Sequence, residues 1–201
     1  GNAILDSVQK ANLTQYMNNN GSLIGIHSAS DTYRHSTANG VNTGSWDWYP
    51  EILGASVQEN PNHVTGTPVY RIDAINTHFL LTGVPDPWFK AEEYYYWEAG
   101  YFNNANVVLQ EVEQTIGPNG TFNSYDSARA VTWYRILPGG NKIFYTSLGH
   151  DASNFTSDLN FYTLLENAVL WTGNLTSNVD YNRGKAGWRL YPNPATEQIF
   201  V

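Results

Sequence analysis

Hydrophobic residues recur with a helical period near both ends of the chain. Apolar side chains stand at positions 4, 5, 8, 13, 16 and 17, and the helix that this spacing predicts ends within residues 18–21. A second helix is predicted over residues 158–171, where apolar side chains stand at 161, 164, 165, 168 and 169. Gly173 follows as its end signal.

Short apolar runs between these helices predict strands. Residues 22–27 form a run typical of a strand buried on both faces, as in parallel sheets covered by helices. Further strand-like runs are residues 68–72, 93–97, 106–110, 130–135 and 142–147. Residues 138–141 read Pro-Gly-Gly-Asn, a turn signal that predicts an antiparallel hairpin between the last two runs. We expect an α/β domain over residues 1–174, a polar linker at 175–187 and a further segment at 188–201.

Composition narrows the class of protein. Of the 201 residues, 41% are hydrophobic, and 7 Trp, 14 Tyr and 8 Phe are available to build a core. The net charge of −8 argues against a nucleic-acid partner, which would need a basic surface. No apolar run approaches the roughly 18 residues of a membrane-spanning helix. The absence of Cys excludes disulfides, thiolate metal sites and a Cys nucleophile.

Two histidines directly follow predicted strands. His27 ends the first apolar run, and His150 follows the last one after a glycine. Ligands of open α/β sheets bind outside the carboxyl ends of the strands, so both imidazoles are candidates for a site there. Each could act as an acid, a base or a metal ligand. The alternative is a histidine satisfied by the backbone, or one on the surface of a turn.

A third group of candidates is aromatic and acidic. If residues 93–97 form a strand, its alternation places Glu93, Tyr95 and Trp97 on one face and Tyr94 and Tyr96 on the other. A carboxylate beside aromatic rings suits a sugar site, but aromatic strands are also ordinary core. The aromatic run around Trp48 allows the same two interpretations.

These motifs, taken in order, resemble the ThuA-like (trehalose utilisation) family over roughly residues 4–174. The residues that carry the resemblance are 21–31, 46–49, 53–54, Asp73, His78, 83–85, Glu93 with Tyr95, 132–135, 144–150 and 168–173. Where the family usually has Asp before Glu93, this chain has Glu92.

The resemblance implies a flavodoxin-like, doubly wound sheet similar to class I glutamine amidotransferases, with the N-terminal strands missing from this chain. Because His27 stands where those enzymes have their Cys nucleophile, glutaminase chemistry is excluded. The resemblance also implies a role in carbohydrate utilisation, on a disaccharide or a keto-glycoside. We expect His27, His150 and Glu93 to be catalytic. Four further residues are expected to bind the carbohydrate: Asp31, Trp48, His78 and Tyr95.

These residues allow two kinds of chemistry. One imidazole could move a proton, or both could hold a divalent metal, although the sequence requires no cofactor. A competing hypothesis is a non-catalytic carbohydrate-binding or scaffold module of a larger surface protein. Residues 190–195 (Leu-Tyr-Pro-Asn-Pro-Ala) resemble the start of a type IX secretion C-terminal sorting domain. That resemblance implies contact with the type IX machinery and an extracellular or cell-surface location.

Overall fold

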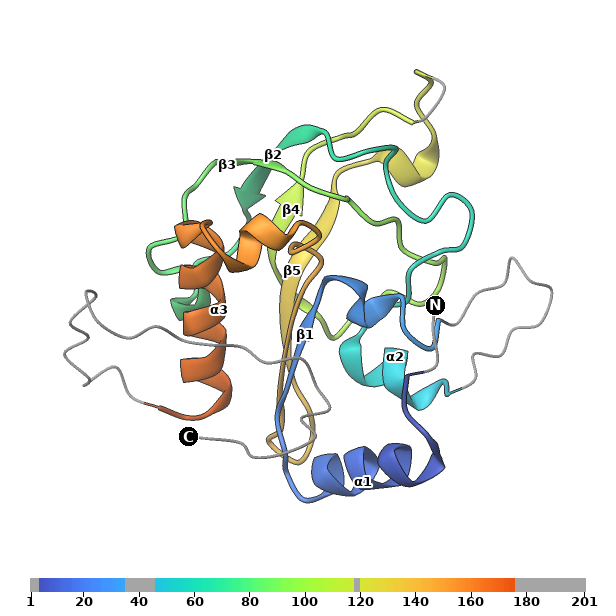
Figure 1. The fold of residues 1–201 in the computed structure, drawn as a ribbon, viewed down its shortest axis with the longest axis vertical. Coiled ribbons are helices and arrows are strands. Elements are labelled where there is room, and N and C mark those ends of the chain that lie inside the picture. Colours follow the sequence, from blue (N-terminus) through green and yellow to red (C-terminus); the bar gives the residue numbers. More distant parts are fainter. Residues whose placement is uncertain (1–3, 35–45, 118–119, 176–201) are drawn as a thin grey trace.

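The computed structural model describes residues 4–34, 46–117 and 120–175, which form a six-stranded sheet with helices on both faces (Figure 1). The strand order is β1-β6-β5-β4-β2-β3. The strands are β1 (Leu23–Ile26), β2 (Val69–Ala74), β3 (Trp88–Ala91), β4 (Val107–Val112), β5 (Arg129–Ile136) and β6 (Lys142–Thr146). The α-helices are α1 (Ser7–Asn18), α2 (Trp48–Leu53) and α3 (Leu159–Thr172), and the short 3-10 turns are η1 (His27–Ser30), η2 (Phe79–Leu81), η3 (Ser124–Asp126) and η4 (Ala152–Phe155).

The directions of the strands differ from the prediction. Strand β1 pairs parallel with β6, whereas the other four pairings are antiparallel. The fold is therefore mixed α/β, and the flavodoxin-like, doubly wound class is not confirmed. Strand β1 is an outer strand of this order, and only Gly25 in it is fully buried. The expectation of a strand buried on both faces is confirmed only in part: Ile24 and Ile26 pack against one core and Leu23 against another, but all three are only half-buried.

Most of the predicted elements are present. The hairpin of β5 and β6 is antiparallel, as the turn at residues 138–141 indicated, and both predicted helices form. The predicted strand at 93–97 is wrong, because this segment leaves the sheet after β3. It runs extended and makes only isolated bridges, from Tyr95 to His63 and from Trp97 to Val57.

Two cores lie on opposite faces of the sheet, because successive side chains of β6 point in opposite directions. Phe144 packs with Phe161 and Leu164 of α3 on one face. Tyr145 packs with Leu53 of α2 and with Trp133 on the other. In Figure 1, α3 and α2 accordingly flank the β1–β6 pair on either side. The two cores thus hold β1 in place from both faces of the sheet.

The predicted linker beyond residue 175 and the segment 188–201 lie outside the described residues. Within residues 4–34, 46–117 and 120–175, no helix has both the length and the apolar character that crossing a membrane requires.

Candidate active site

The parallel pairing of β1 with β6 brings the first two candidates together. Ile26 lies opposite Thr146, so the residues that follow each strand emerge at the same edge of the sheet. His27 follows directly and adopts a left-handed conformation with φ of 47°, which is unusual for a residue with a side chain. Its carbonyl accepts a hydrogen bond of 2.8 Å from the Tyr145 hydroxyl. The buried tyrosine therefore fixes the strained turn that presents the imidazole.

The ring of His27 is oriented by the backbone of the neighbouring strand end. Its Nδ1 lies 2.8 Å from the carbonyl oxygen of Ser147, which can only accept, so Nδ1 carries a proton. In the neutral ring the lone pair is then on Nε2. That nitrogen lies 3.0 Å from the hydroxyl of Tyr95, whose ring stacks on the imidazole with centroids 4.7 Å apart.

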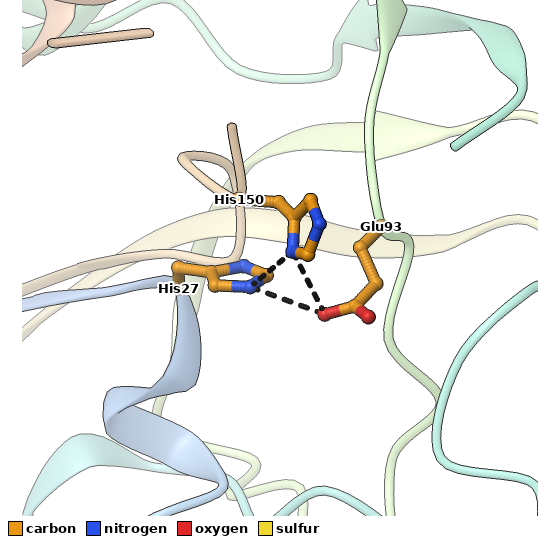
Figure 2. Close-up of side chains that lie close together, drawn as sticks. All are labelled: His27, Glu93 and His150. Carbon is orange, nitrogen blue, oxygen red and sulfur yellow. Dashed lines mark hydrogen bonds and ion pairs between the residues drawn. The ribbon is translucent and has the colours of Figure 1, made fainter. Parts of the chain in front are cut away.

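Glu93 reaches the same nitrogen from the extended segment after β3. Its Oε2 lies 3.1 Å from His27 Nε2 and 3.4 Å from Nδ1 of His150. The two imidazole nitrogens are 3.3 Å apart. Figure 2 shows the three side chains converging from three separate segments. The His150 side chain is 42% exposed, so the cluster opens to solvent on that side.

The electrostatics of the cluster favour an ionised carboxylate. When the His27 ring is protonated on both nitrogens, Nε2 donates to Glu93, and this hydrogen bond lowers the pKa of Glu93 below its usual range; burial opposes the shift, and the neighbouring His63 and His150 reinforce it. Burial by itself would lower the pKa of His27, but the hydrogen bonds to Glu93 and Ser147 and the charge of Glu92 raise it overall. Burial also raises the pKa of Tyr95, whose hydroxyl therefore stays neutral and can donate.

Two residues that sequence reasoning did not select support this cluster. His63 Nε2 lies 3.1 Å from the second carboxylate oxygen of Glu93, and its Nδ1 lies 2.7 Å from the Val64 carbonyl. The buried carboxylate of Glu92 accepts hydrogen bonds from the backbone N–H groups of Gly149, His150 and Glu93. For Glu92, the signal in the sequence was its departure from the Asp that the family usually has at this position. For His63 no signal beyond its residue type was present.

Of the other predicted binding residues, Tyr95 contacts the cluster, the charge of Asp31 acts on Tyr95 and helps to raise its pKa, and Trp48 and His78 lie elsewhere. The Asp31 carboxylate follows η1 and pairs with Arg34, whose Nε is 2.7 Å away. Trp48 begins α2 and stacks on Trp46, with centroids 4.9 Å apart. His78 caps η2 and stacks on Tyr134, 4.6 Å away. Within the described chain, no ring contact or hydrogen bond joins Trp48 or His78 to the cluster, so the structure does not bring these two residues to it.

The fold is of a class of α/β proteins that has been seen before. The structure is similar to the crystal structure of a ThuA-like protein from Parabacteroides merdae, with a TM-score of 0.61 and 14% sequence identity. The alignment covers 88% of this chain and 69% of that one. Residues 1–172 match the family model ThuA, described as trehalose utilisation, and the chain therefore belongs to this family. No curated protein matches the chain.

Proposed function

We propose that this domain is a carbohydrate-processing enzyme in which His27, Glu93 and His150 bind a divalent transition-metal ion and act on a disaccharide or a keto-glycoside. Membership of the trehalose utilisation family supports the substrate class. The observation that carries the proposal is the spacing of the three donor atoms, which is 3.1, 3.3 and 3.4 Å. Four-coordinate zinc, with bonds of ~2.0–2.2 Å, places its ligand atoms about 3.4 Å apart.

The donor set also fits a metal chemically. Two neutral imidazoles and one carboxylate suit Zn²⁺ and other first-row divalent ions. Such a ligand needs its second ring nitrogen to be held by an acceptor, and the Ser147 carbonyl does this for His27. The Nε2 of His63, 3.1 Å from the second oxygen of Glu93, limits the rotation of that carboxylate. The exposure of His150 leaves room for a substrate oxygen beside the ion.

The roles of the residues follow from this geometry. A bound divalent ion would polarise a hydroxyl or carbonyl oxygen of the sugar as a Lewis acid. The neutral hydroxyl of Tyr95 lies beside His27 Nε2 and can donate to a sugar oxygen that binds there. If no metal binds, the same pair of imidazoles with Glu93 between them can transfer a proton to or from the sugar.

The test is turnover by the full chain on trehalose, other disaccharides and 3-keto-glycosides, with and without Zn²⁺, Mn²⁺ or Co²⁺. We expect metal-dependent turnover that falls by roughly 100-fold or more in His27→Ala and in Glu93→Gln. His78→Gln, a histidine outside the cluster, should leave turnover unchanged. The absorption spectrum of bound Co²⁺ should change in the cluster variants alone. Sugar binding without turnover, unaltered in His27→Ala, would instead establish a non-catalytic binding module.

We extend the proposal to the location of the protein. The resemblance of residues 190–195 to the start of a type IX sorting domain supports export to the surface or the medium. Expression in a bacterium that has this secretion system, with and without residues 188–201, tests it. We expect the protein outside the cell only when this segment is present, and equal export of both forms would contradict the idea.

A further inference from the structure

A pocket of about 320 Å³ lies directly beside the cluster, with His150 at its edge. Its walls come from β3 and from the segment that includes η4 and the start of α3. The volume falls at the lower end of the range for small-molecule sites, roughly 300–1,000 Å³. The polar side chains used in the argument below are Lys90, Glu92, Asp151, Asn154 and Asp158.

Lys90 is the unusual member of this pocket, because its side chain is only 7% exposed. Its ammonium group donates to Asp158 Oδ2 at 2.7 Å and to Asn154 Oδ1. Glu92 Oε2 is 4.0 Å away, beyond hydrogen-bond distance. An ammonium group has three N–H donors, and only two of them have an acceptor within the part of the chain that the structure describes. The third can bind an oxygen of a ligand.

The charges in the pocket indicate what kind of ligand it fits. One cation, Lys90, faces three carboxylates, from Glu92, Asp151 and Asp158. This balance disfavours an anion such as a phosphate, and it suits a neutral ligand with several hydroxyl groups. A hydroxyl can accept from the ammonium and donate to a carboxylate at the same time. Trp88, whose ring lies 5.2 Å from Lys90 Nζ, adds an apolar wall.

We propose that this pocket is a second sugar subsite, which binds the ring next to the one that reacts at the cluster. The inference rests on the proposed function, because it assumes a carbohydrate substrate with more than one ring. His150 belongs to both sites, so a disaccharide bound across it would place one ring at His27 and Glu93 and the other at Lys90. Lys90 is then a binding residue that distinguishes disaccharides from monosaccharides.

The alternative is that Lys90 only ties β3 to the start of α3 through Asp158. Replacing a buried ion pair by apolar side chains often costs no stability, so packing alone does not explain the lysine. The two explanations differ in one measurable respect. A purely structural lysine would affect stability and leave the preference for disaccharides unchanged.

The experiment compares the binding of trehalose and of D-glucose by calorimetry in the wild type, Lys90→Met and Lys142→Met. Lys142 is the matched control, since it also donates to an Asn side-chain oxygen, that of Asn174, and also lies over a Trp ring, that of Trp171. We expect Lys90→Met to weaken trehalose binding roughly 10-fold or more, with little change for glucose. Lys142→Met should change neither. Equal affinities of the wild type and a folded Lys90→Met for trehalose would overturn the proposal.

A second variant and two further measurements allow the result to be interpreted. If Lys90→Met does not fold, Asp158→Asn serves instead, because Asn is an equally good N-cap for α3 while its NH₂ group replaces the oxygen that accepts from Lys90. Amide chemical-shift changes on adding trehalose should concentrate at Lys90, Ala91, Ser153 and Asn154. Changes confined to other parts of the chain would also reject the subsite. Metal titration of the same variants tests the proposed function separately, since Lys90→Met should bind Zn²⁺ as the wild type does.

Discussion

The carboxylate of Glu92 holds the backbone of His150, whose N–H donates to its Oε1 at 3.0 Å. The same oxygen accepts the N–H of Glu93 at 3.0 Å, and Oε2 accepts the N–H of Gly149 at 2.7 Å. One buried side chain therefore fixes the positions of two residues of the cluster. Such support determines how precisely donor atoms are held, and the first prediction follows from it.

Glu92→Gln should weaken both the fold and the site. An amide has one acceptor oxygen, so at least one of the three backbone N–H groups would face an NH₂ group. We expect a loss of about 1–3 kcal/mol in the free energy of unfolding and a roughly 10- to 100-fold lower affinity for Zn²⁺. Urea denaturation and metal titration measure the two effects. Glu113→Gln, which alters an exposed carboxylate on the Arg71 N–H, is the control and should change neither.

His63→Ala should affect metal binding more than stability. The ring is half-buried and holds one oxygen of Glu93 at 3.1 Å, so its removal frees the carboxylate to rotate. We expect a roughly 10- to 100-fold weaker Zn²⁺ affinity, by competition with a chelator, and a change in unfolding free energy below about 1 kcal/mol. Zn²⁺ affinity equal to that of the wild type would show that Glu93 is oriented by other groups.

Gly149→Ala should destabilise the turn that carries His150. Gly149 has φ of 115°, and an added Cβ would lie 3.0 Å from Phe161 and 3.1 Å from Ile26. Gly140→Ala is the matched control, because φ there is 85° but nothing lies within 4 Å of the added atom. Both variants place a residue with a side chain at positive φ, which costs about 1–3 kcal/mol in each. The contacts of the added Cβ with Phe161 and Ile26 should therefore make Gly149→Ala the more destabilising. Equal unfolding free energies for the two would contradict the role of this close approach.

Asp126 should make stability depend on pH in the acid range. Burial alone would raise the pKa of Asp126, but hydrogen bonds from Tyr96, Asn123 and Thr115 lower it below the ordinary value of 3.8. Because the folded pKa is the lower one, the stabilisation is complete above the ordinary pKa, which holds in the unfolded chain, and is lost as the pH falls through the folded value. Asp126→Asn should therefore be less stable than the wild type near neutral pH, and the difference should shrink below about pH 4. A difference that does not vary with pH, measured by denaturant unfolding, would contradict this.

The local signals in the sequence correctly predicted several elements. The turn at residues 138–141 predicted the hairpin of β5 and β6, and the helical period predicted α3 almost to the residue. The alternation at residues 93–97 also persists, with Glu93 and Tyr95 directed to His27 and Tyr96 directed to Asp126. It persists because side chains alternate in any extended segment, whether or not the segment joins a sheet.

The sequence by itself determined where most of the helices, turns and extended segments lie, although not α2 and β3, and which proton-handling side chains follow them, because these properties depend on neighbours within a few residues. Apart from the β5–β6 hairpin, only the tertiary structure decided which strands pair and in which direction, and that placed residues 93–97 outside the sheet. It also decided that His63 and Glu92 support the cluster while Trp48 and His78 lie apart from it. Pairing and side-chain convergence join residues tens of positions apart, such as Glu92 and Gly149, and no local period encodes such contacts.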